Sequence, residues 1–368
     1  MKIVSAFLAV LVFGALAQTP SAPVVIKGGY PVLFLRFSPN GGELVRLCAF
    51  GPVALFDTTS YRRARTFLTE IEHTPGLMMV AYSPDGTRIA TADGYGGARV
   101  WNAADPGRPM PKKGASFFGV DELYVLDTPL QVLQAPGPDR GLDVLWTGFS
   151  PDGKLLITTH ANGHVKVWNT SSWAVEAELI VWDSGLRVAA FAPDSKTVVI
   201  GYGGGGLHHW SLETKTEIRT LPMFEAVGNL GEHLPAALNV AFSPDGKTLV
   251  ATHMSKSLGD GAVTIWNTTD WIAHTEQGDS AAFSKDGKLL ALGTLRHIKL
   301  IEPVSGKQIR DIELPDLTWG EVSRRFENES NANDKIPCVV GALAFSPDGN
   351  TLAAGCSEGT VRVVKMTP

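Results

Sequence analysis

The feature that most constrains the fold of this chain is a four-residue turn of the Ser-Pro-Asp-Gly type that occurs seven times. The first residues of its copies are Ser38, Ser83, Ser150, Ala192, Ser243, Ser284 and Ser346, and successive copies start 41 to 67 residues apart. In such a turn proline presets φ at the second position, aspartate bonds the local backbone, and glycine takes the positive-φ position. A unit repeated at this spacing predicts a repeat architecture in which neighbouring units bury one continuous core.

Each turn is flanked by short segments with the pattern of β-strands. Apolar runs such as residues 80–82 and 343–345 precede the turn, and runs such as residues 154–157 follow it. A third strand follows, as at residues 164–168, and then a shorter fourth strand, as at residues 176–180. No sustained 3.6-residue pattern supports helices. Four strands repeated about every 42 residues predict an all-β, seven-bladed β-propeller of four-stranded antiparallel blades.

An aromatic residue recurs at one register of the repeat, eighteen residues after the first residue of the turn. This register holds Phe56, Trp101, Trp168 and Trp210, and in the fifth unit, whose loop is longer, Trp266. The sixth and seventh units carry Ile301 and Val364 instead. We expect these side chains to pack between adjacent blades, with apolar contacts alone in the last two units.

These motifs resemble the WD-repeat family of seven-bladed propellers over residues 24–368. Members of that family often place a Gly-His pair before the turn, with the His ten residues ahead of it, and this chain keeps the His in three units and the Gly in none. The resemblance implies structural hydrogen bonding of His, loop Asp and Trp with a hydroxyl such as Thr91. The residues to which it assigns this role are His73, His233, His274, Asp260, Trp266 and Trp101.

The last repeat ends directly after its third strand, while residues 22–27 form an unassigned strand at the other end of the propeller sequence. We predict that this N-terminal strand becomes the fourth strand of the last blade and closes the ring. Pairing of this kind would cover a strand edge that otherwise invites aggregation.

The first 17 residues have the pattern of a secretory signal peptide. Lys2 precedes a short apolar stretch, and residues 15–17 form an Ala-Leu-Ala cleavage site. We therefore expect residues 1–17 to be removed, and residues 18–368 to form a single propeller, exported to the bacterial periplasm or the extracellular space. No later stretch is long and apolar enough to span a bilayer, so no membrane insertion is expected after cleavage of the leader.

Composition and motifs exclude several function classes. With 32 Lys and Arg against 37 Asp and Glu, the net charge of −5 gives no basic stripe for nucleic acid. The chain lacks H-E-x-x-H, G-x-S-x-G, P-loop and C-x-x-C motifs, so we expect no catalytic residues, no metal site and no cofactor. The expected function, implied by the resemblance, is a secreted, non-catalytic platform that binds a protein partner as a monomeric propeller.

The alternative is a small-molecule-binding or enzymatic propeller that uses the central channel. Titratable residues converging from several first strands would favour this alternative. The first strands carry few such residues, and Arg36 and Asp143 are the exceptions.

The chain has three cysteines, Cys48, Cys338 and Cys356, so at least one stays unpaired within the chain. A hairpin centred on the last turn places Cys338 and Cys356 nearly opposite each other, within reach of a disulfide. Two alternatives remain open: a disulfide, or two buried thiols, of which the thiols are the simpler interpretation.

Four insertions interrupt the basic period and are candidate sites of function, since propeller loops carry specificity. They cover residues 104–127, 222–232, 253–261 and 314–337. The last three are expected on one face of the ring, in neighbouring blades. The insertion at residues 314–337 contains aromatic and Arg residues, which are favoured interface anchors. The predicted partner-binding residues are Trp319, Arg324, Arg325 and Phe326.

Overall fold

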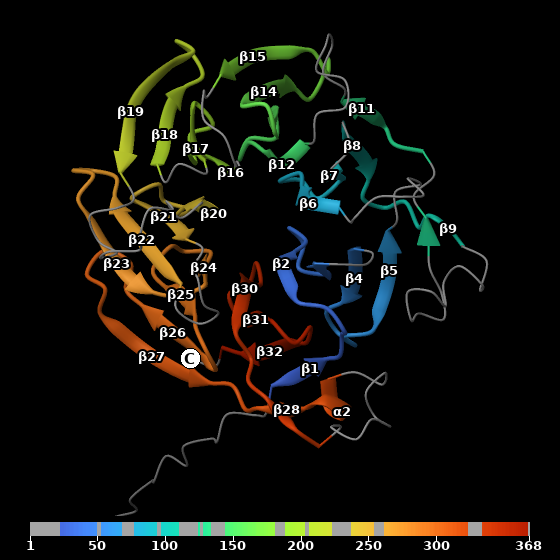
Figure 1. Ribbon diagram of the computed structural model, residues 1–368. Coiled ribbons are helices and arrows are strands. Elements are labelled where there is room, and N and C mark those ends of the chain that lie inside the picture. Colours follow the sequence, from blue (N-terminus) through green and yellow to red (C-terminus); the bar gives the residue numbers. More distant parts are fainter. Residues whose placement is uncertain are drawn as a thin grey trace, which may run out of the picture.

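The computed structural model shows seven four-stranded antiparallel sheets arranged around a central space, which confirms the predicted seven-bladed propeller (Figure 1). It describes residues 23–49, 53–67, 77–93, 97–109, 124–125, 128–133, 144–180, 188–202, 206–222, 237–253, 261–322 and 333–366. The predicted leader lies outside these residues. Within them, no helix is long and apolar enough to cross a membrane.

Blades 1 to 4 follow one another along the chain, each built from the channel outward. Blade 1 contains β2 (Val32–Phe37), β3 (Glu43–Cys48), β4 (Val53–Asp57) and β5 (Arg63–Phe67). Blade 2 contains β6 (Leu77–Tyr82), β7 (Arg88–Asp93), β8 (Gly97–Asn102) and β11 (Gln131–Leu133). Blade 3 contains β12 (Val144–Phe149), β13 (Leu155–His160), β14 (His164–Asn169) and β15 (Val175–Ile180). Blade 4 contains β16 (Val188–Phe191), β17 (Thr197–Gly201), β18 (Gly206–Ser211) and β19 (Thr216–Pro222).

Blades 5 and 6 repeat this order, and the N-terminal strand completes blade 7. Blade 5 contains β20 (Ala237–Phe242), β21 (Thr248–His253), β22 (Ala262–Asn267) and β23 (Ala273–Gln277). Blade 6 contains β24 (Ser280–Phe283), β25 (Leu290–Gly293), β26 (His297–Ile301) and β27 (Gln308–Glu313). Blade 7 contains β30 (Val340–Phe345), β31 (Thr351–Cys356) and β32 (Val361–Lys365), completed by β1 (Val24–Ile26).

The N-terminal strand closes the ring, as predicted. β1 pairs antiparallel with β32, with Val25 opposite Arg362. Arg46 of blade 1 donates from Nη1 to the carbonyl oxygen of Lys27 at 3.0 Å, directly after β1. Ile26 is buried in the core between blades 7 and 1, so the closing strand contributes both hydrogen bonds and apolar contact.

The ring has two faces that differ in their loops. We call the face with the seven repeated turns the turn face, and the opposite face the insertion face; first strands begin and second strands end at the insertion face. The described part of the 104–127 insertion forms a two-stranded sheet of β9 (Arg108–Pro109) and β10 (Tyr124–Val125), and β10 lies against β5. The other three insertions leave from the insertion face, while residues 223–236 and 254–260 lie outside the described part of the chain.

The turns of neighbouring blades contact one another around most of the turn face. In most blades the glycine adopts a positive φ, as Gly86 does at 72°. A Cβ atom on Gly86 would lie 3.7 Å from Pro39 of the preceding turn, and equivalent contacts join Gly41 to Pro347 and Gly153 to Pro84. Each proline therefore packs against the next blade's turn, which couples neighbouring blades.

Two turns depart from this pattern. In blade 4, Ser195 replaces glycine, keeps a positive φ of 60°, and accepts a hydrogen bond from the backbone N–H of Asp152 at 3.2 Å. In blade 6, Lys285 replaces proline, and no atom lies within 4 Å of the Cβ position of Gly349 in the next turn. The proline contact is therefore lost between blades 6 and 7.

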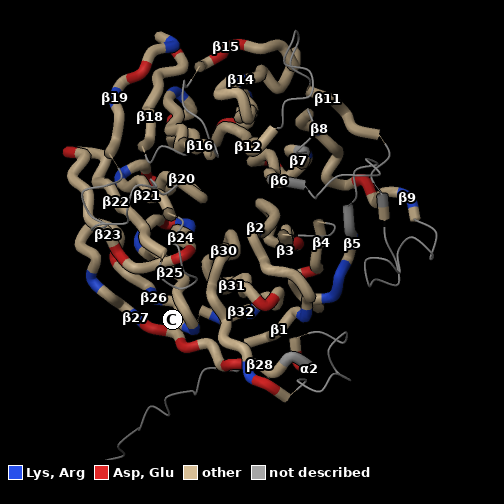
Figure 2. Tube along the Cα trace, in the orientation of Figure 1, with Lys and Arg blue, Asp and Glu red and all other residues tan. Residues whose placement is uncertain are grey.

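The aromatic residues of the repeat pack between blades, as predicted. Trp101 lies with Val45 and Leu55 of blade 1, and Trp168 lies with Ala90 and Val100 of blade 2. Ile301 and Val364 occupy the same register in blades 6 and 7 and are buried among apolar neighbours. Charged residues gather on the outer strands, whereas the inner strands are almost free of them (Figure 2).

The aspartates of the turns give the fold a sensitivity to acid. In blades 2, 5, 6 and 7, the hydrogen bond from the turn serine is the main cause that lowers the pKa of the aspartate below its usual 3.8. A lowered pKa stabilises the folded state above the unfolded-state pKa, and this contribution is lost as pH falls through the folded-state value. The four residues are Asp85, Asp245, Asp286 and Asp348.

We expect the quadruple Asp→Asn variant of these turns to lose less unfolding free energy than the wild type between pH 6 and pH 3. Asparagine can replace aspartate here because Asn40 accepts the equivalent bonds in blade 1, from Ser38 Oγ at 2.7 Å and Gly42 N–H at 2.9 Å. The carboxylates are largely solvated, so each contributes less than about 1 kcal/mol. Urea unfolding followed by tryptophan fluorescence at several pH values gives the slope of the unfolding free energy against pH. Equal slopes for both proteins would contradict this assignment.

Candidate interaction site on the insertion face

β-bulges interrupt the first strands at the insertion-face mouth of the central channel and leave two leucine side chains exposed. In five first strands the pairing register with the second strand skips the second residue. The skipped residues are Leu33, Met78, Leu145, Leu238 and Gly341. Leu33 is 58% exposed and Leu238 is 40% exposed, although both belong to innermost strands. Bulges commonly re-aim side chains next to functional sites.

The base of the 314–337 insertion lies at the outer edge of blade 7, next to β1 (Figure 1). β28 (Leu317–Thr318) pairs with β29 (Lys335–Ile336), and the short helix α2 (Trp319–Val322) follows β28 directly. Thr318 caps this helix: its backbone N–H donates to Glu321 Oε2 at 2.7 Å, and its Oγ1 accepts from the Glu321 N–H at 3.3 Å. This reciprocal pair is a capping box, which explains why a helix begins here.

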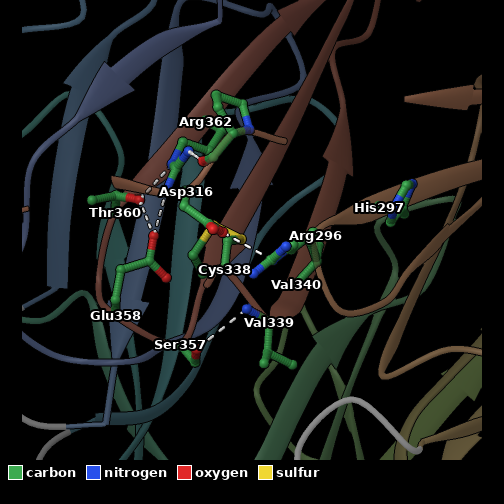
Figure 3. The surroundings of a disulfide bond; sticks show 12 residues. Arg296, His297, Asp316, Cys338, Val339, Val340, Ser357, Glu358, Thr360 and Arg362 are labelled. Atoms are coloured by element: carbon green, nitrogen blue, oxygen red, sulfur yellow. Dashed lines mark hydrogen bonds and ion pairs between the residues drawn. A yellow bond between two sulfur atoms is a disulfide. The ribbon is translucent and has the colours of Figure 1, made fainter. Parts of the chain in front are cut away.

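A buried arginine anchors the start of the insertion. The side chain of Arg362, on β32, is 0% exposed and donates from Nη1 to the carbonyl oxygen of Pro315 at 2.8 Å. The same guanidinium donates from Nε to Thr360 Oγ1 at 2.8 Å and pairs through Nη2 with Glu358 Oε1 at 2.7 Å (Figure 3). Three partners thereby hold the guanidinium, and one of them, the Pro315 carbonyl oxygen, fixes the insertion to the blade that closes the ring.

A disulfide anchors the end of the insertion. Cys338 and Cys356 are bonded, with an S–S distance of 2.03 Å, so the structure holds a disulfide rather than two buried thiols. Arg296 of blade 6 lies beside it: its backbone N–H donates to the Cys338 carbonyl oxygen at 2.8 Å, and its Nε pairs with Asp316 Oδ1 at 2.9 Å (Figure 3). The insertion is therefore held at both ends, between blades 6 and 7.

The carboxylate of Glu358 lies close to the two cysteine sulfurs and has one unused oxygen. Oε2 of Glu358 is buried and has no hydrogen-bond partner among the described residues. With the sulfurs bonded to each other, neither is a thiolate that could ligate a metal. The role of Glu358 here is to neutralise Arg362.

Of the residues predicted to form structural hydrogen bonds, the structure describes Trp101, Trp266 and His274. Trp101 Nε1 donates to Thr91 Oγ1 at 2.9 Å, and Trp266 is buried between blades 4 and 5. His274 lies on the outer strand β23 rather than in a loop, and its buried Nε2 has no hydrogen-bond partner among the described residues. The predicted bond of His274 is therefore not formed at this atom. His73, His233 and Asp260 lie outside the described residues.

The predicted partner-binding residues fall largely outside the described chain. Trp319 is the first residue of α2, while Arg324, Arg325 and Phe326 lie in residues 323–332, which the structure does not describe. Their role stays a prediction.

Sequence reasoning missed the Arg362 network and the bond from Trp168 Nε1 to Thr158 Oγ1 at 2.9 Å. Both left a signal. Thr158 precedes Trp168 by ten residues, as Thr91 precedes Trp101. Arg362 stands between Val361 and Val363 in the third strand β32, and a charge among apolar residues needs a buried partner.

Three segments of the chain match the family profile of the WD domain, G-beta repeat, at residues 65–102, 128–169 and 333–365. These segments include the greater part of blades 2, 3 and 7. The propeller contains WD40 repeats. The other four blades keep the architecture with sequences further from that profile.

Curated relatives are similar at low identity. Telomerase protein component 1 of Rattus norvegicus is 25% identical over 88% of this chain and 12% of its own length. The Protein LST8 homolog of Drosophila melanogaster is 28% identical over 48% of this chain and 51% of its own length. The Serine-threonine kinase receptor-associated protein of Gallus gallus is 22% identical over 92% of this chain and 80% of its own length. The match to the first two covers about half of the relative's length or less.

Proposed function

We propose that this protein is an exported, non-catalytic platform that binds a protein partner on its insertion face. The observation that carries the proposal is the pair of exposed leucines, Leu33 and Leu238, which β-bulges present at the channel mouth on the face that also bears three insertions. The two side chains rim the same mouth from blades 1 and 5, and an apolar rim of this kind is a candidate interaction site.

Two further observations support the proposal. The base of the 314–337 insertion is fixed by Arg362 and by the Cys338–Cys356 disulfide, which orders a surface in advance and lowers the entropy that binding must overcome. Among the relatives, the Gallus gallus protein is named for its association with a receptor. Trp319, Arg324, Arg325 and Phe326 are the proposed anchors within the insertion.

The proposed export to the periplasm or the extracellular space rests on the leader pattern in residues 1–17 and on the disulfide. Disulfides persist in oxidising compartments and are rare in the cytosol. Cleavage after Ala17 is read directly from the N-terminal sequence of protein recovered from the culture medium or the periplasm.

The platform is tested by affinity capture with tagged protein from an extract of the source organism. We expect one stoichiometric partner, and we expect Leu33→Asp with Leu238→Asp to weaken its binding about tenfold or more. Replacing residues 323–332 by a Gly/Ser linker, which keeps the anchored base, tests the insertion separately.

The matched control is the double variant Ile272→Asp with Ile309→Asp. These side chains are 69% and 55% exposed and lie away from the insertion-face mouth, after β22 and on β27. Partner binding that falls equally in both double variants, or no specific partner at all, would overturn the proposed surface.

A further inference from the structure

The central channel is a cavity of about 570 Å³, and most of the side chains that line it are aromatic or aliphatic. Its wall includes the aromatic residue that precedes the turn in every blade. These residues are Phe37, Tyr82, Phe149, Phe191, Phe242, Phe283 and Phe345. Trp146 and Phe34 add two more rings. A concave, mostly apolar space of this size is typical of small-molecule sites.

One position in each innermost strand, two residues before the turn, is occupied by a very small residue in six blades. Those residues are Ala81, Gly148, Ala190, Ala241, Ala282 and Ala344. In blade 1 the same position holds Arg36, which lines the cavity. The small residues leave the space into which one long side chain can reach.

Arg36 is the one charged residue in the seven innermost strands, β2, β6, β12, β16, β20, β24 and β30. No carboxylate is among the described residues that line the cavity. The surrounding walls desolvate the guanidinium, which lowers the pKa of Arg36 from its usual value, while the side chain keeps access to solvent in the channel. Arginine stays protonated in proteins, so Arg36 brings a positive charge into a channel whose described walls hold no carboxylate.

We propose that the channel binds a small carboxylate with an aromatic or branched apolar body. The carboxylate pairs with the Arg36 guanidinium, whose planar fork suits bidentate contact with two oxygens. The apolar body lies against the rings that line the channel. This site goes beyond the proposed platform, since it uses the channel interior rather than the insertion face.

A small molecule fits the channel better than a polypeptide segment does. A peptide would bring backbone N–H and C=O groups into the cavity, and each such group needs a hydrogen-bond partner. The described wall offers few polar side chains for them, chiefly Ser83, Ser150 and Asn239. A molecule with a single charged group needs only one partner, and Arg36 supplies it.

The test uses 3-phenylpropionate and 2-naphthoate, each beside its neutral primary amide, titrated into the full mature chain. Calorimetry gives the affinity, and the fluorescence of Trp146 in the channel wall reports occupancy. We expect each acid to bind at least tenfold more tightly than its amide, and this preference to disappear in Arg36→Ala. That variant is expected to fold, because alanine occupies the same position in five other blades.

A relocated charge makes the test independent of the Arg36 position. In the double variant Arg36→Ala with Ala190→Arg, the guanidinium enters the same layer of the channel from blade 4, and we expect the preference for acids to return. Three results would overturn the proposal: equal affinity of wild type for acid and amide, an acid preference that persists in Arg36→Ala, or binding of only a peptide with a free carboxyl terminus.

Discussion

Replacing Glu358 with alanine is expected to lower the free energy of unfolding by about 3–5 kcal/mol, because it leaves a buried cation without its counterion. The Arg362 side chain is 0% exposed and that of Glu358 is 1% exposed, and their atoms Nη2 and Oε1 lie 2.7 Å apart. Water cannot replace the lost carboxylate at this depth. The charged Arg362 would either stay unpaired or leave the core, and both outcomes release the carbonyl oxygen of Pro315.

Urea unfolding of the single variant, read by tryptophan fluorescence, measures this change. The double variant Glu358→Leu with Arg362→Met removes both charges and is expected to recover most of the loss. Lys288→Ala is the surface control, since Lys288 pairs with Asp286 in solvent at 3.5 Å and such pairs contribute little. A Glu358→Ala protein within about 1 kcal/mol of the wild type would show that the pair is not the anchor described above.

A chain that begins at Gly29, without the closing strand, is expected to melt on the order of 10 °C lower than a chain that begins at Gln18. Removing β1 exposes the edge of β32, removes the buried Ile26, and frees Arg46 from the Lys27 carbonyl oxygen. The uncovered edge is also expected to promote association that grows with protein concentration.

Differential scanning calorimetry gives the melting temperature, and light scattering gives the association. Val24→Thr is the matched control, because Val24 is 42% exposed and its side chain adds little to the core. An unchanged melting temperature after removal of the strand would refute ring closure by β1.

Most of the fold could be predicted because its signals are local. Each turn can be recognised from four residues, because proline, aspartate and glycine have known conformational preferences in turns. The strand pattern and the position of the aromatic residue then repeat around each turn. Seven repeats with weak individual signals therefore support the same fold. Even the long-range pairing of β1 with β32 was predictable, since the last repeat lacks one strand and the N-terminus has one to spare.

The site was less predictable because it depends on contacts between residues that are distant in sequence. Arg362 meets Pro315 across the 314–337 insertion, and nothing in either segment alone shows that contact. The bulges that expose Leu33 and Leu238 follow from strand register, which a hydrophobic pattern does not specify to one residue. His274 lies in the outer strand β23 because the connection from β23 to β24 consists of only two residues, Gly278 and Asp279.

The position of β1 in blade 7 also sets an order of events during synthesis. Val24 leaves the ribosome roughly 340 residues before its partner Val363. At about 5–20 residues per second, the emerging chain spends some twenty seconds to a minute with its first strand unmatched. Earlier blades can form sheets in that interval, but the ring stays an open arc until the final strand arrives. Closure of the ring therefore waits for β32, the strand that pairs with β1.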